Sequence, residues 1–111
     1  MMQFFDQIYG TRIGTMPAGS MSVSKDTSMD CDGYSGAGTW VINYSFPDGI
    51  QSKEMPHPGC GYAGTSRTAY LPMNAEGTKI CRMLQVAFKR RLNFTVGHSI
   101  TSGADDTTVC F

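Results

Sequence analysis

The chain has 111 residues, of which 41% are hydrophobic and 16% are charged, and its formal net charge at pH 7 is zero. This length and composition are typical of one globular domain and exclude an intrinsically disordered chain. The balanced charge gives no long-range attraction to nucleic acid or to an anionic membrane, and no apolar run is long enough to span a bilayer, so neither partner is expected.

The amino-terminal residues 1–14 have no basic start and no continuous apolar run, which argues against a signal peptide. We therefore expect the chain in the cytoplasm or the nucleus, where thiols stay reduced. None of the four cysteines forms a Cys-x-x-Cys pair, and neither histidine lies at zinc-ligand spacing from one. The prediction is that the cysteines are free thiols packed as small hydrophobic groups, and that no metal is bound. They are Cys31, Cys60, Cys81 and Cys110.

Residues 10–38 are rich in Gly, Ser and Asp and have little periodicity, so they are predicted to form turns and extended loops. The first predicted strand is Thr39–Phe46, in which large apolar residues from Trp40 onward alternate with smaller ones. A Pro-Asp-Gly turn at 47–49 ends it, and residues 50–51 start a short returning strand. The prolines and glycines of residues 52–66 predict an ordered loop and exclude a regular helix.

A short strand is predicted over residues 67–71, and the main helix over about residues 75–91. Asn74 is a good N-cap, and a basic run that ends at Arg91 is expected to close the last turn. The predicted apolar stripe consists of Ile80, Leu84, Ala87 and Phe88.

Strands at residues 92–96 and 107–111 complete the predicted order. The fold class is therefore α+β: a small mixed sheet with one main amphipathic helix and long ordered loops. The strand around Trp40 should pack beneath the helical segment that ends in Phe88, in one core.

Residues 59–64 match the dinucleotide-binding pattern G-x-G-x-x-G, but a proline-rich segment precedes them and extended chain follows. That fingerprint requires a strand before it and a helix after it, so a tight glycine loop is the favoured interpretation. His57 and His98 could act as acids or bases, or they could be surface histidines without a catalytic partner. Spacing alone defines no nucleophile–base arrangement.

Several blocks, taken in chain order, resemble one known family. They are Gly-Thr-Trp-Val-Ile-Asn-Tyr at 38–44, Pro-Asp-Gly-Ile-Gln at 47–51, Ala-Tyr-Leu-Pro at 69–72, Ala-Phe-Lys-Arg-Arg-Leu at 87–92 and Phe-Thr-Val-Gly at 94–97. The sequence resembles the C-terminal domain of the Deltex RING-type ubiquitin ligases from about residue 9 to residue 109. We expect a linker-like segment at 1–14 and a Deltex C-terminal-like domain at 15–111, truncated at its C-terminal end.

The resemblance implies a module of ubiquitin ligases that act in Notch-type signalling and in ADP-ribose-linked ubiquitylation. In that family the RING recruits the charged E2, and the C-terminal domain binds NAD or ADP-ribose. The implied partners are ubiquitin, an E2-recruiting RING protein in trans and ADP-ribosylated proteins. The implied nucleotide-binding residues of this chain are Gly97, Ser99, Thr101, Arg67 and Tyr70.

The sequence also departs from the family pattern. No zinc-ligand array precedes Tyr9, and the family's later paired-histidine motif, with a further histidine and glutamate, is not found before Phe111. The family's His-Pro-Asn-Pro-Gly motif reads Met-Pro-His-Pro-Gly at 55–59, and Ile100 replaces a serine. Catalysis by this chain alone is therefore not expected. The alternatives are a non-catalytic module that binds ADP-ribose or a protein, and a truncated, inactive paralogue.

Overall fold

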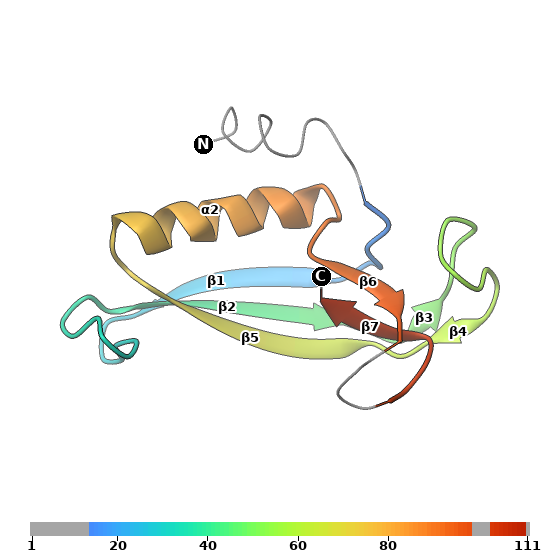
Figure 1. Cartoon of the computed structure of the whole chain (residues 1–111), viewed down its shortest axis with the longest axis horizontal. Coiled ribbons are helices and arrows are strands. Elements are labelled where there is room, and N and C mark those ends of the chain that lie inside the picture. Colours follow the sequence, from blue (N-terminus) through green and yellow to red (C-terminus); the bar gives the residue numbers. More distant parts are fainter. Residues whose placement is uncertain (1–13, 99–102, 111) are drawn as a thin grey trace.

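A computed structural model describes residues 14–98 and 103–110. One long helix lies along one face of a three-stranded sheet, and a two-stranded hairpin closes one end of that face (Figure 1). The predicted α+β class is confirmed. The elements are β1 Ser20–Asp26, β2 Thr39–Phe46, β3 Gly49–Ile50, β4 Gly61–Tyr62, β5 Thr65–Pro72, α2 Ala75–Lys89, β6 Phe94–Gly97 and β7 Thr107–Cys110.

The main sheet has the order β1-β2-β5, and both pairings are antiparallel. Strand β2 lies in the centre and has the predicted bounds, because its alternating apolar residues give it one fully packed face. Ile42, Tyr44 and Phe46 are buried on that face. The hairpin β6–β7 and the short pair β3–β4 are also antiparallel, and an isolated parallel bridge joins Ala63 to Thr107.

Strand β1 corrects the prediction of loops throughout residues 10–38. Its only apolar residues, Met21 and Val23, pair with Tyr44 and Ile42 of β2 and are half-buried against the core. The intervening serines face away from the helix and are exposed. Two apolar residues among serines are too weak a period-two signal to separate an edge strand from a loop.

Helix α2 begins as predicted and ends two residues earlier. The Asn74 side chain accepts a hydrogen bond of 2.7 Å from the Gly77 amide. Arg90 is the C-cap, and Arg91 has a φ of 60° that takes the chain out of the helix. Leu84 and Phe88 of the predicted stripe pack against the core. The stripe was wrong at Ile80, which is 38% exposed, and the buried position there is Cys81.

The core is a cluster of aromatic rings between the sheet, the helix and the hairpin. The ring of Phe94 on β6 lies 4.9 Å from Tyr44 and 4.7 Å from Phe46, centroid to centroid. Phe88 packs against the same two β2 rings, and the indole of Trp40 donates a hydrogen bond of 3.0 Å to Thr78. Trp40 and Phe88 therefore pack against one core, as predicted.

The thiols differ from their predicted packing. Cys81 is buried, Cys31 is half-buried and Cys60 is exposed, so the prediction is wrong for Cys60, which lies in the glycine-rich loop. Over the described ranges, no cluster of three or more His, Cys, Asp or Glu side chains is arranged to hold a metal ion. No helix there is long and apolar enough to cross a membrane.

Candidate functional site

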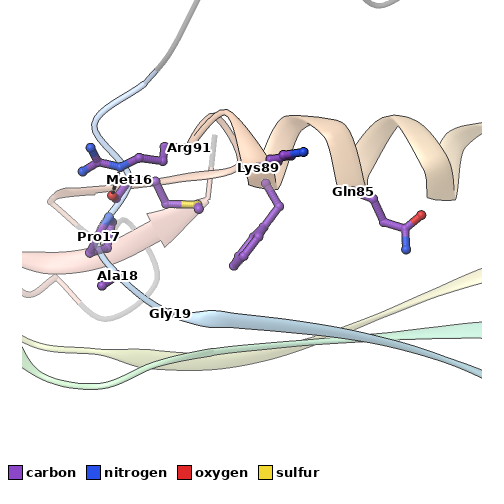
Figure 2. A pocket seen from close by; sticks show the side chains of 8 residues that line it. Met16, Pro17, Ala18, Gly19, Gln85, Lys89 and Arg91 are labelled. Carbon is purple, nitrogen blue, oxygen red and sulfur yellow. Dashed lines mark hydrogen bonds between the residues drawn. The ribbon is translucent and has the colours of Figure 1, made fainter. Parts of the chain in front are cut away.

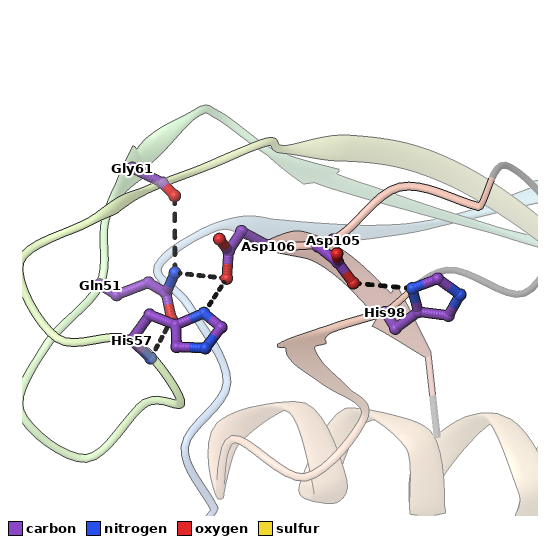
Figure 3. Close-up of polar contacts among 6 residues, drawn as sticks. All are labelled: Gln51, His57, Gly61, His98, Asp105 and Asp106. Carbon is purple, nitrogen blue, oxygen red and sulfur yellow. Dashed lines mark hydrogen bonds and ion pairs between the residues drawn. The ribbon is translucent and has the colours of Figure 1, made fainter.

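The loop between β3 and β4 docks against the loop that precedes β7, and Gln51 joins them (Figure 3). Gln51 is only 3% exposed. Its amide nitrogen donates to the Asp106 carboxylate at 3.1 Å, and its carbonyl oxygen accepts the backbone N–H of His57 at 2.9 Å. A buried amide with both ends satisfied fixes the loop, since leaving either end unpaired costs free energy. The expected short strand at 50–51 is present as β3, one residue earlier.

His57 and Asp106 form an exposed imidazole–carboxylate pair. His57 Nδ1 lies 2.6 Å from Asp106 Oδ1. This hydrogen bond, with the charge of Asp106, raises the pKa of His57 above its ordinary value of 6.5. Hydrogen bonds from His57 and Gln51 lower the pKa of Asp106. An ionised carboxylate can only accept, so Nδ1 carries the proton and Nε2 is the nitrogen left for a ligand or a proton.

A second pair of the same kind lies on the other side of the same loop. His98 Nδ1 is 2.8 Å from Asp105 Oδ1, and both side chains are exposed. The neighbouring carboxylates of Asp105 and Asp106 thus each hold one imidazole, as Figure 3 shows. Asp106 has a φ of 51°, in the left-handed region that only a few non-glycine residues adopt. Two hydrogen bonds to its side chain and one from the Ala63 amide to its carbonyl hold it there.

One predicted site residue lies beside this cluster. Gly97 pairs with Thr107, the residue that follows Asp106. A Cβ at Gly97 would meet no atom closer than 3.9 Å, so packing within the domain does not require a glycine here. Ser99 and Thr101 lie outside the described residues.

The two predicted residues on β5 do not come together. Arg67 pairs with Tyr44 and so shares the face that carries the helix, whereas Tyr70 pairs with Val41 and lies on the opposite face. Tyr70 is 53% exposed, and the Arg67 guanidinium donates to the Ser66 carbonyl. A nucleotide in contact with both Arg67 and Tyr70 would have to wrap around the edge of the sheet. The binding role of each of these two residues stays a prediction.

The described residues fit part of a nucleotide. A glycine with no close neighbour and two imidazoles suit a ribose or a phosphate, because they offer N–H donors and, at His57, a nitrogen that takes up a proton near neutral pH. Asp105 and Asp106 oppose a diphosphate by charge, although each is paired with a histidine. The arrangement can bind a polar ligand or move one proton at His57 Nε2. Among the described side chains it offers no activated nucleophile.

Sequence reasoning missed Gln51 and Asp106 as the partners of His57. The histidine between two prolines was a visible signal of a fixed direction. Its carboxylate partner is 49 residues away in the chain, so no local pattern identifies it.

Comparisons with known proteins extend over nearly the whole chain. The family model of the Deltex C-terminal domain matches residues 13–111. The human "Probable E3 ubiquitin-protein ligase DTX3" is 46% identical over 98 residues, which is 87% of this chain and 28% of that protein. The mouse "E3 ubiquitin-protein ligase DTX1" is 41% identical and the mouse "E3 ubiquitin-protein ligase DTX4" 39% identical, each over 92% of this chain. The chain spans only 16% and 17% of the length of these two relatives. It belongs to the Deltex C-terminal domain family.

Proposed function

We propose that this domain is a module of a Deltex-type ubiquitin ligase and acts with an E2-recruiting RING protein in trans. Its 46% identity to a probable E3 ubiquitin ligase, over 87% of the chain, carries the proposal. Ubiquitin is the proposed partner, with ADP-ribosylated proteins as further ones. The proposed setting is Notch-type signalling in the cytoplasm or nucleus.

We further propose that the domain holds a partial site for ADP-ribose or NAD beside Gly97. What supports this is the glycine that packing does not require, next to two imidazoles whose Nδ1 atoms are fixed by carboxylates. The Gly97 backbone would contact the ligand, with the hydroxyls of Ser99 and Thr101. His57 Nε2 would hydrogen-bond a ribose hydroxyl or a phosphate oxygen.

Calorimetric titration of the full chain with ADP-ribose tests the nucleotide site. Ser99→Ala and Thr101→Ala should each weaken binding about tenfold, the usual scale for one hydrogen bond to a charged group. Thr68→Ala is the matched control, because Thr68 is exposed and pairs with Asn43, on the face of the sheet that carries no helix. Binding that is absent at millimolar ADP-ribose, or equally weakened by Thr68→Ala, would reject this site.

Ubiquitin transfer tests the ligase module separately. The chain is mixed with E1, E2, ubiquitin and a Deltex-type RING fragment supplied in trans, and transfer is compared with and without the chain. Stimulation by the chain supports the module. A chain that binds ADP-ribose but never changes transfer would instead be the non-catalytic binding module, which is the second candidate.

A further inference from the structure

The helix-facing side of β1 continues, at the start of the strand, into a hollow beside the end of the helix, and we name this surface the β1–α2 groove. Helix α2 packs over β5 and β2, and on the same side of the sheet Met21 and Val23 of β1 are only half-buried. At the start of β1 the groove deepens into a hollow of about 530 Å³ between the segment Met16 to Gly19 and the end of the helix (Figure 2). Phe88 gives this hollow an apolar lining, and Gln85 and Lys89 form its helical wall.

The floor of the groove is a strand with an open edge. Met21, Val23 and Lys25 pair with Tyr44, Ile42 and Trp40, so all three face the helix side of the sheet. Strand β1 is the outer strand of the order β1-β2-β5, and its second edge pairs with no strand of the described ranges. Its seven residues therefore offer backbone N–H and C=O groups for an added strand, beside a groove that receives alternate side chains.

The charges along this groove have one sign. Arg82 shares a helix flank with Gln85 and Lys89, and those two residues line the hollow opposite the segment that leads into β1. Lys25 lies at one end of the groove, with its Nζ 5.4 Å from the Trp40 ring centroid, and Lys89 lies at the other end. Arg82 and Lys89 are exposed, and neither forms an ion pair with a described residue.

Carboxylates near the two ends of the groove already have partners. Asp26 accepts hydrogen bonds from Ser28, and Glu54 is paired with Arg91. Asp26 keeps its negative charge, but it pairs with Thr39 and so lies on the face of the sheet away from the helix. The charge of Glu54 is balanced by Arg91. An occupant with acidic groups at both ends would complement Lys25 and Lys89.

We propose that the β1–α2 groove binds an extended acidic peptide of a partner protein, which adds to the edge of β1 as an antiparallel strand. In this register an acidic residue lies opposite Lys25, apolar residues lie opposite Val23 and Met21, and a second acidic residue reaches Lys89. Alternate residues of a strand are about 6.6 Å apart and point to the same face. Every second side chain of the peptide therefore faces the helix side of the sheet, and these side chains meet Lys25, Val23, Met21 and Lys89 in turn. The remaining side chains lie beside the exposed serines of β1 and can be polar.

A synthetic peptide tests the register directly. The probe is a fluorescein-labelled Glu-Thr-Val-Thr-Leu-Thr-Glu with a blocked carboxyl end, titrated into the full chain by fluorescence polarisation. We expect saturable binding that increases the hydrogen-exchange protection of β1 amides. The same peptide with Lys in place of both Glu should bind at least about tenfold more weakly. N-methylation of the peptide at its Val or at the Thr that follows it separates edge pairing from side-chain contact, because only alternate N–H groups point at β1.

Charge reversal on the protein completes the test. Lys89→Glu and Arg82→Glu should each weaken binding of the acidic peptide about tenfold and improve binding of the Lys peptide. Lys53→Glu makes the same charge change on an exposed loop and should have little effect. The proposal is wrong if the acidic peptide does not bind, if both N-methyl peptides bind equally well, or if Lys53→Glu acts like Lys89→Glu. Self-association of the chain through β1, without peptide binding, would assign the edge to a second copy and also overturn it.

Discussion

Replacing Gly77 with alanine should destabilise this domain, although the same change stabilises most helices. Alanine is favoured over glycine in a helix by about 1 kcal/mol. Gly77 is buried in the first turn of α2, against the end of β5. A Cβ at this position would lie 1.9 Å from the Pro72 carbonyl oxygen and 3.2 Å from Asn74 Oδ1.

The expected size follows from the movement that this contact requires. Carbon and oxygen atoms that are not bonded stay about 3 Å apart or more, so the first turn of α2 must move from Pro72 by more than about 1 Å. Overpacking of this kind costs about 1–3 kcal/mol. The same movement strains the Asn74 cap, which is worth about 1 kcal/mol. After the gain in helix propensity, the net loss in the free energy of unfolding is about 1–3 kcal/mol.

Urea unfolding followed by the fluorescence of the single tryptophan measures this loss. Trp40 is a suitable reporter because its indole is bonded to Thr78, the residue next to Gly77. Gly61→Ala is the control, since a Cβ there would come no closer than 3.7 Å to any atom, and it should be nearly neutral. A Gly77→Ala variant as stable as the parent chain would refute the packing of α2 against Pro72.

Three further predictions concern the cap, the site and the thiols. Asn74→Ala should lower the free energy of unfolding by about 1 kcal/mol, and Asn74→Ser should restore most of it; equal losses for both variants would contradict the cap. In NMR titration, His57 should have a pKa above 6.5 that returns to the ordinary value in Asp106→Asn. The raised His57 pKa and the lowered Asp106 pKa mean that the pair stabilises docking of the loop between these two values. This contribution is lost as the pH rises through the His57 pKa, and it is also lost as the pH falls through the Asp106 pKa. A His57 pKa that stays equally raised in Asp106→Asn would count against the pair. A thiol reagent should modify exposed Cys60 long before buried Cys81, whose pKa is raised by burial, and the reverse order would contradict the packing.

The sequence predicted the elements that have strong local signals. Strand β2 carries four large apolar residues at period two, and its bounds were correct. The start of α2 followed from Asn74, a good cap before a helical pattern. Strand β1 was missed because an edge strand with one packed face needs few apolar residues. The helix end was misplaced because Arg90 and Arg91 suit a last turn, while the Arg91 backbone is left-handed and the Leu92 amide turns back to the Ala87 carbonyl.

The candidate site was less accessible to sequence reasoning. His57 was named as a possible acid or base or a surface histidine from the residues themselves, whereas Gly97 was named only through the family resemblance. The buried Gln51 and the left-handed Asp106 join the loops of these two residues. Neither glutamine nor aspartate has a local sequence pattern that indicates such a role. Tertiary pairing of β6 with β7 brings Asp106 beside Gly97, and only then does His57 gain its carboxylate. Arg67 and Tyr70 are three residues apart on one strand, so an odd spacing already places them on opposite faces.

Arg91 connects the two regions that carry the proposals. Its Nε donates to the carbonyl oxygen of Met16 at 2.8 Å, in the wall of the β1–α2 groove. Its Nη1 lies 3.2 Å from the carboxylate of Glu54, in the loop that presents His57. One planar guanidinium therefore joins the wall of the groove to the histidine-bearing loop. The ion pair with Glu54 is half-exposed, so it contributes at most about 1 kcal/mol, and the contact with the Met16 carbonyl is the one that fixes the side chain.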